Sequence, residues 1–311
     1  MTGPGSTSNP PQIIYKYTDL NGAQQILSNR TLRFTRPSEM NDPFDVRIDE
    51  WVGMEHKELF EKIGPLVFAW IMSSAERASK HLRMDLSTAS STVQAFQNSS
   101  DAEKTEMMNE AGTISEGDFA REFQCARDSM EKTRDIFSAA FEHYGIFCAT
   151  STFSNLLMWA HYAGGHSGAV LGFRPDRTKD SMLGMMRPVI YRDQRVHGIE
   201  SPVDYVKGLE VSGVENARMI ADRLLHTKSV EWSYEEEWRL SITDVVKTGE
   251  AASFFRFYPS ELAEVYIGYR MSAEYRSEII RLARTVSPDV QIFAAKLAKR
   301  KYALEFETIT E

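Results

Sequence analysis

The sequence has 311 residues, with 36 Lys and Arg against 44 Asp and Glu, and therefore a formal net charge of −8. Hydrophobic residues make up 42% and aromatic residues 11%, which is typical of a well-packed globular chain. The acidic balance excludes a protein held on nucleic acid by its overall field, although it leaves a local basic groove open.

No membrane segment or secretory leader is expected. No apolar run approaches the ~20 residues that cross a bilayer, and residues 1–12 are rich in Gly, Ser, Pro and Thr, which predicts a disordered tail. Cys125 and Cys148 lie among apolar neighbours, and their spacing fits neither a disulfide framework nor a zinc cluster. We therefore expect a cytoplasmic protein.

The first elements predicted after the tail form a strand–helix–strand unit. Residues 13–17 are β-branched and aromatic, which predicts a strand, and residues 20–27 carry apolar side chains at helical spacing. A second strand is predicted over residues 31–35. An Asn-Asp-Pro-Phe-Asp turn follows, which either places Asp42 or Asp45 in a pocket or forms an ordinary Asx-turn.

A long helical insertion is predicted next. No proline occurs between Pro65 and Pro175, and glycine is almost absent from the first part of this stretch. We therefore assign residues 51–143 to an all-helical insertion, with a Ser- and Asn-rich loop near Asn98.

Short apolar runs bounded by turn residues resume at Tyr144 and predict strands, with a helix over residues 203–227 and a capped amphipathic helix over residues 272–286. Strands and helices alternate too irregularly for a doubly wound sheet. The predicted fold class is α+β, with a mixed or antiparallel β core formed by residues 13–50 and 144–311.

Two carboxylates in one segment are the strongest candidates for chemistry. Glu235 and Glu237 are two positions apart on a predicted strand and therefore point to the same face. Such a pair can hold a hydroxyl and stabilise developing positive charge, or it can belong to a solvated edge strand. Trp232 and Trp238 beside them favour a cleft, because a wholly solvated edge rarely carries two tryptophans.

A second candidate segment leaves a strand through hydroxyl residues and enters a short helix. Trp159, His161 and Tyr162 predict an aromatic wall with one titratable group, although the aromatic rings can equally belong to the core and the histidine can be structural. No metal-ligand spacing and no Gly-x-Ser-x-Gly elbow is present. A late basic cluster either contacts phosphates or forms a solvated turn. It comprises Lys296, Lys299, Arg300 and Lys301.

Taken together, these strings resemble a family of bacterial proteins catalogued as domain-of-unknown-function family 2971. The resemblance covers most of the chain outside the tail and the insertion. The matching strings are Tyr15-Lys16-Tyr17, Pro37, Asn41-Asp42-Pro43-Phe44, Trp159-Ala160-His161-Tyr162-Ala163, Gly168, Lys228, Trp232, Glu235-x-Glu237-Trp-Arg239 and Ile267-Gly268.

The order of these elements also resembles that of ADP-ribosyltransferases, which implies an NAD-using enzyme. The resemblance makes Glu237 the catalytic acid, Glu235 the residue that orients the acceptor, and His161 a further catalytic candidate. The first strand carries Lys16 where that superfamily has Arg or His, and Lys16, Arg33 or Lys228 is the implied cation for the diphosphate of NAD. The full implied NAD-binding set is Tyr15, Lys16, Tyr17, Arg33, Asn41, Asp42, Ser151, Thr152, Trp159, Tyr162 and Lys228.

The function expected from this resemblance is transfer of ADP-ribose from NAD to a nucleic-acid or protein acceptor, as in bacterial toxins and antiviral-defence effectors, with an inhibitory or regulatory protein as a further partner. The main alternative is a non-catalytic module that binds a nucleotide or a partner. A nuclease or phosphodiesterase needs clustered carboxylates for two metals, and the sequence offers no second cluster.

Overall fold

The computed structural model describes residues 11–111, 116–243 and 250–310, so most of the predicted N-terminal tail lies outside the described residues. The chain divides into two compact units. The first comprises the chain up to Val46, Ala140–Gln194, and the chain from Leu225 onward. The second combines Arg47–Ala139 with Arg195–Leu224, a segment that the sequence analysis assigned to the core.

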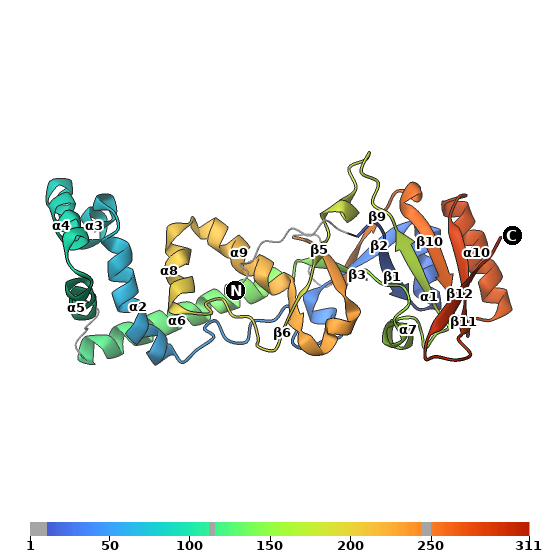
Figure 1. The fold of residues 1–311 in the computed structure, drawn as a ribbon, viewed down its shortest axis with the longest axis horizontal. Coiled ribbons are helices and arrows are strands. Elements are labelled where there is room, and N and C mark those ends of the chain that lie inside the picture. Colours follow the sequence, from blue (N-terminus) through green and yellow to red (C-terminus); the bar gives the residue numbers. More distant parts are fainter. Residues whose placement is uncertain (1–10, 112–115, 244–249, 311) are drawn as a thin grey trace. The chain divides into compact units, whose positions relative to one another are not determined.

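The first unit is built on a mixed β-sheet (Figure 1). Its main path runs in the order β12-β11-β10-β4-β1-β3-β2-β9, and β8 pairs with β3 and β5. The β10–β11 pair is parallel and the other pairs are antiparallel, which is the mixed type of core that the sequence predicts. The strands are β1 (Ile14–Thr18), β2 (Thr31–Thr35), β3 (Gly145–Thr150), β4 (Ala169–Phe173), β5 (Arg187–Pro188), β8 (Glu237–Ile242), β9 (Ala252–Arg256), β10 (Leu262–Ile267), β11 (Gln291–Leu297) and β12 (Leu304–Thr308). A separate parallel pair joins β6 (Ile190–Arg192) to β7 (Thr227–Ser229).

Helices cover both faces of this sheet. Helices α1 (Leu20–Asn29) and α10 (Ala273–Val286) pack on one face, where their apolar side chains join a core with β1, β4 and β10. Figure 1 shows α10 (red) beside the C-terminal strands. The short helix α7 (Leu156–Tyr162) packs on the opposite face, against alternate residues of the same strands. Four 3-10 helices connect these elements: η1 (Pro37–Glu39), η2 (Met182–Met185), η3 (Val230–Glu235) and η4 (Pro259–Glu261).

Side-chain capping explains where several of these helices begin. The Asp19 carboxylate accepts a hydrogen bond from the Gly22 amide at 2.7 Å and so caps α1. Asn155 caps α7, and Ser272 caps α10. The cap at Ser272 agrees with the capped helix predicted over residues 272–286.

The second unit is helical. Apart from one isolated bridge between Val52 and Ile199, its described residues contain no β-pairing. The predicted single helix over residues 203–227 is two helices, because the chain breaks at Val211 and Ser212. The helices are α2 (His56–Ile71), α3 (Ala75–Leu82), α4 (Leu86–Asn98), α5 (Asp101–Ala111), α6 (Glu116–Phe141, which ends in the first unit), α8 (Pro202–Glu210) and α9 (Gly213–Leu225). In the described part of the chain, no helix is long and apolar enough to cross a membrane.

Candidate functional site

A pocket of about 440 Å³, including the space that opens to solvent, lies in the first unit. Strands β1, β3 and β8, helix α7 and the loop after η1 supply its walls. The space in it that a water-sized group can occupy is about 80 Å³, well below the ~300–1,000 Å³ of whole-ligand sites, so it accommodates only part of a cofactor-sized ligand. The lining residues are Tyr15, Lys16, Tyr17, Met40, Asn41, Cys148, Ala149, Thr150, Met158, Tyr162, Lys228, Glu235 and Glu237.

The two carboxylates of the Glu-x-Glu segment both reach this pocket, but not in the way that the sequence predicts. Glu235 ends the 3-10 helix η3, and only Glu237 belongs to β8, so the prediction of one strand carrying both residues is wrong. The residue between them, Glu236, has a left-handed backbone with φ 46°. This tight turn, rather than strand alternation, brings Glu235 and Glu237 to the same side chain, Lys228.

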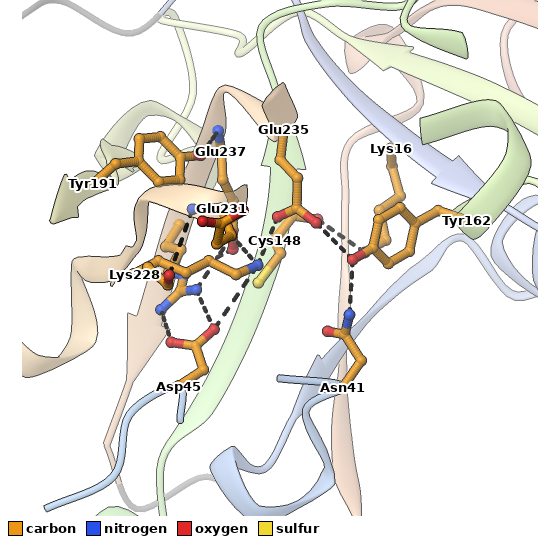
Figure 2. Close-up of polar contacts among 12 residues, drawn as sticks. Lys16, Asn41, Asp45, Cys148, Tyr162, Tyr191, Lys228, Glu231, Glu235 and Glu237 are labelled. Atoms are coloured by element: carbon orange, nitrogen blue, oxygen red, sulfur yellow. Dashed lines mark hydrogen bonds and ion pairs between the residues drawn. The ribbon is translucent and has the colours of Figure 1, made fainter. Parts of the chain in front are cut away.

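Lys228 lies between the carboxylates and is almost fully buried. Its ammonium group donates to Glu235 Oε2 at 2.6 Å and to Glu237 Oε2 at 3.0 Å. It also lies 4.8 Å from the centre of the Trp232 ring, a cation–π distance. Figure 2 shows Lys228 reaching across to Glu235.

Arg239 and Asp45 complete the buried network behind the pocket. The Arg239 guanidinium has no exposed surface, donates from Nε to Glu237 Oε1 at 2.7 Å, and contacts both oxygens of Asp45. Its Nη1 also donates to the Leu225 carbonyl at 2.9 Å. Asp45 lies next to Val46, where the chain first leaves the first unit, and Leu225 is where the chain returns to it for the last time. One guanidinium therefore holds both of these segments.

Arg239 was not assigned to the site from the sequence. It is two positions from Glu237 on a strand, and this spacing is the one sequence signal that points to it. Asp45 was one of two acidic residues that the turn was expected to place in a pocket, with an ordinary Asx-turn as the alternative. Its contact with Arg239 joins positions 194 residues apart, so no local pattern could reveal it.

The network shifts the pKa values of Glu235 and Glu237 in opposite directions. Burial favours the neutral form of Glu237, but Arg239 and Lys228 outweigh it and hold the pKa of Glu237 well below its usual range. For Glu235 burial dominates, and its pKa is raised despite the Lys228 cation. Burial lowers the pKa of Lys228, but the carboxylates Glu237, Glu235 and Asp45 more than offset this and raise it.

The count of charges agrees with this assignment. Asp45, Glu235 and Glu237 contribute three negative charges when ionised, against two positive charges from Lys228 and Arg239. One carboxylate is therefore in excess. Burial raises the pKa of both Glu235 and Asp45, and of these two only Glu235 lines the pocket.

A polar chain leads from Glu235 to the rim of the pocket (Figure 2). The Tyr162 hydroxyl donates to Glu235 Oε1 at 2.6 Å, and Asn41 Nδ2 donates to the Tyr162 hydroxyl at 2.8 Å. Asn41 is exposed and Tyr162 is half-buried, so this chain connects a buried carboxylate with solvent. Burial and the contact with Glu235 raise the pKa of Tyr162 above its ordinary value, which keeps its proton in place.

Lys16 of strand β1 also lines the pocket. Its ammonium group donates to the Cys148 carbonyl at 2.8 Å and lies 5.3 Å from the centre of the Phe147 ring. Burial lowers the pKa of Lys16. It also raises the pKa of the neighbouring Cys148 thiol, which favours the neutral form of that thiol.

The lowered pKa of Lys16 predicts a specific pH dependence of stability. Between its folded value and its ordinary 10.5, the unfolded chain binds more protons than the folded chain, so stability rises with pH in that window. Lys16→Met lacks this effect. We therefore expect the free energy of unfolding of the wild type, relative to that of Lys16→Met, to increase as the pH rises from about 7 towards about 10.

Urea denaturation of both proteins at several pH values measures this difference. Lys57→Met, which replaces an exposed lysine, is the control and should track the wild type. A difference between wild type and Lys16→Met that stays constant over the window would contradict the prediction.

The pocket brings together eight of the residues predicted for the site: Tyr15, Lys16, Tyr17, Asn41, Tyr162, Lys228, Glu235 and Glu237. Trp159, His161 and Arg33 are not among its lining residues. Trp159 is fully buried and packs edge-on against Tyr17, with ring centres 5.6 Å apart, so it supports the wall from behind. His161 and Arg33 have exposed side chains.

Asp42, Ser151 and Thr152 also lie outside the lining. One Asp42 oxygen accepts from the Phe44 amide at 2.9 Å, which is the Asx-turn that the sequence left as an alternative. Ser151 donates to Glu236 at 2.7 Å, and Thr152 Oγ1 accepts from the Ser154 amide. These two residues therefore hold the turns that follow β3. Among the described residues, no group of three or more His, Cys, Asp or Glu side chains is arranged to hold a metal ion.

Residues 158–240 match the family model described as "Protein of unknown function (DUF2971)". Over this stretch the chain is similar to the DUF2971 family. The DUF2971 region contains Tyr162, Lys228, Glu235 and Glu237, whereas Lys16 and the rest of the β1 wall lie before it. Comparisons with curated proteins and with solved structures found no match to the chain.

Proposed function

We propose that the first unit binds NAD with its nicotinamide ribose in this pocket and transfers ADP-ribose to a nucleic-acid or protein acceptor. The observation that carries the proposal is the pair of glutamates with opposite protonation tendencies around one lysine. Sites that hydrolyse glycosides use such a pair, with one ionised carboxylate and one that exchanges a proton. Nicotinamide leaves NAD as a neutral molecule, so here the proton that is exchanged is the one the acceptor loses.

The arrangement of strands supports the same proposal. The β1–α1–β2 start, the hydroxyl residues at the end of β3, and β8 with Glu237 at its first position follow the order of elements in ADP-ribosyltransferases. The pairing of β3 with both β1 and β8 brings these elements together at one pocket.

The pocket suits one end of NAD better than the other. Tyrosine rings and carboxylates match a ribose and an aromatic base by their chemistry. Among the described lining residues, the cations are Lys16 and Lys228, and both already have partners. The diphosphate therefore belongs near the pocket mouth, where exposed Arg33 is the nearest candidate cation on β2.

When bound, NAD supplies a glycosidic bond whose cleavage leaves positive charge on the ribose. Glu235 is the residue best placed to meet a ribose hydroxyl, because within the described residues its Oε1 has only the Tyr162 hydroxyl as a hydrogen-bond partner. Glu237 is held by two cations and keeps Lys228 in position. The geometry thus favours Glu235 for direct contact and Glu237 for positioning, the reverse of the division that the resemblance implies.

A direct test is incubation of the full chain with radiolabelled NAD and a bacterial lysate, followed by protease or nuclease digestion. Label that stays in macromolecules and disappears with one of the two digestions identifies the acceptor class. Absence of both labelling and nicotinamide release would contradict the proposal.

A non-catalytic binding module is the second candidate, and one observation favours it. The charged residues of the network form ion pairs with one another, as expected where carboxylates complete a polar wall. They are Lys228, Arg239, Asp45, Glu235 and Glu237. The two functions differ in one result. A binding module retains its ligand without releasing nicotinamide, whereas a transferase consumes it.

A further inference from the structure

The tip of the β11–β12 hairpin carries a concentrated positive charge in an acidic protein. Lys299, Arg300 and Lys301 are consecutive, exposed, and without an ion pair in the described structure. Lys296, the fourth cation of the basic cluster, pairs with Glu307 on the neighbouring strand. The three tip cations are therefore available to a partner.

Aromatic and apolar surface adjoins these cations. Tyr302 is 101% exposed and Leu297 is 61% exposed, which are high values for large side chains in an ordered hairpin. Backbone hydrogen bonds hold the loop in shape, from the Ala298 amide to the Ala303 carbonyl at 3.1 Å and from the Ala303 amide to the Lys301 carbonyl at 2.9 Å. The tip is thus a formed surface that presents a ring beside three cations.

The hairpin belongs to the same sheet as the pocket strands, and one of its side chains, Phe306, lies on the face that carries the pocket. Phe306 of β12 is half-buried, and its ring centre lies 5.3 Å from that of Phe153. The Phe153 ring centre in turn lies 5.3 Å from that of Tyr15, a pocket residue. The neighbouring carboxylates of β12, Glu305 and Glu307, alternate with Phe306 and point to the opposite face.

We propose that residues 297–303 are a docking surface for single-stranded nucleic acid, with the phosphates on Lys299, Arg300 and Lys301 and a base stacked on Tyr302. Proteins that bind single strands combine cations along the backbone with aromatic rings that stack on unpaired bases. A duplex offers no unpaired base to the ring. The net charge of −8 restricts such binding to a local surface of this kind.

The inference is independent of the reaction proposed above, because it depends on the hairpin alone. If the acceptor is a nucleic acid, the tip gives the first unit a second contact with it, besides the pocket. A protein that turns over NAD but does not bind nucleic acid contradicts only the docking surface. A protein that binds nucleic acid but does not turn over NAD contradicts only the proposed reaction.

The test is fluorescence anisotropy of the full chain with a labelled oligouridine, at about 50 mM and about 200 mM salt. We expect K299A/R300A/K301A to bind at least about tenfold more weakly and to reduce the slope of log affinity against log salt by about 2, since each phosphate contact in a single strand contributes about 0.7. Y302A should lose about 5- to 150-fold in affinity with an unchanged slope.

A matched triple variant, K57A/K62A/R127A, makes the same change in net charge at exposed residues of the second unit. Each of these cations pairs with a glutamate four positions away. It should bind like the wild type. Equal losses in both triple variants, an unaffected tip variant, or no binding by the wild type at the lower salt would overturn the proposal. Binding to phosphatidylserine vesicles but not to the oligonucleotide, lost in the tip variant, would also overturn it and assign the tip to a lipid surface.

Discussion

Replacement of Arg239 by methionine is expected to lower the free energy of unfolding by about 3–5 kcal/mol. The guanidinium has no exposed surface and holds the carboxylates of Asp45 and Glu237. Its removal leaves two buried acidic groups short of a partner and frees the Leu225 carbonyl as well. Urea denaturation with linear extrapolation measures the loss.

Arg127→Met is the control for this variant. Arg127 pairs with Glu131 across an exposed helix surface, and such pairs contribute less than about 1 kcal/mol. A double-mutant cycle with Asp45→Asn adds a second check. Since Asp45 and Arg239 interact directly with each other, the double variant should lose less free energy of unfolding than the sum of the losses of the two single variants. Additive losses, or a loss for Arg239→Met no larger than the control, would show that this network does not stabilise the first unit.

The second large effect concerns Glu235. If the protein consumes NAD, Glu235→Gln should reduce the rate of nicotinamide release about 10²–10³-fold, because the amide neither carries charge nor exchanges a proton at neutral pH. NAD affinity should change far less, since the amide can still form a hydrogen bond to a ribose hydroxyl. Nicotinamide release under saturating NAD and calorimetric NAD binding measure the two quantities separately.

Glu236→Gln is the matched control, because it makes the same chemical change one position along the chain. Its carboxylate is exposed and accepts from Ser151, away from the pocket. Full activity in Glu235→Gln would assign the chemistry elsewhere. Wild-type protein that is folded but neither binds nor consumes NAD would end the transferase proposal and leave the binding module as the better account.

Glu237→Gln is expected to behave differently from Glu235→Gln. The variant removes a charge that both Arg239 and Lys228 contact, so stability should fall together with any activity. A comparison of the two glutamine variants therefore tests whether Glu237 acts on a ligand or positions the groups that do.

The sequence alone predicted the elements whose cause is local. β-branched and aromatic residues predicted β1, apolar residues at helical spacing predicted α1, the cap at Ser272 predicted the start of α10, and the scarcity of proline and glycine predicted the helices after His56. It also pointed to most residues that line the pocket, because their side-chain chemistry stands out within short strings. These features depend on backbone propensities and on neighbours within one turn of helix or strand.

Only the tertiary structure decided how the site is assembled. The left-handed turn at Glu236 brings Glu235 to Lys228, and Arg239 reaches Asp45 across 194 positions of sequence. The segment Arg195–Leu224 likewise joins the helical unit through contacts with distant residues. Such contacts are set by packing between segments far apart in the chain, and a buried ion pair leaves no periodic pattern from which it can be predicted.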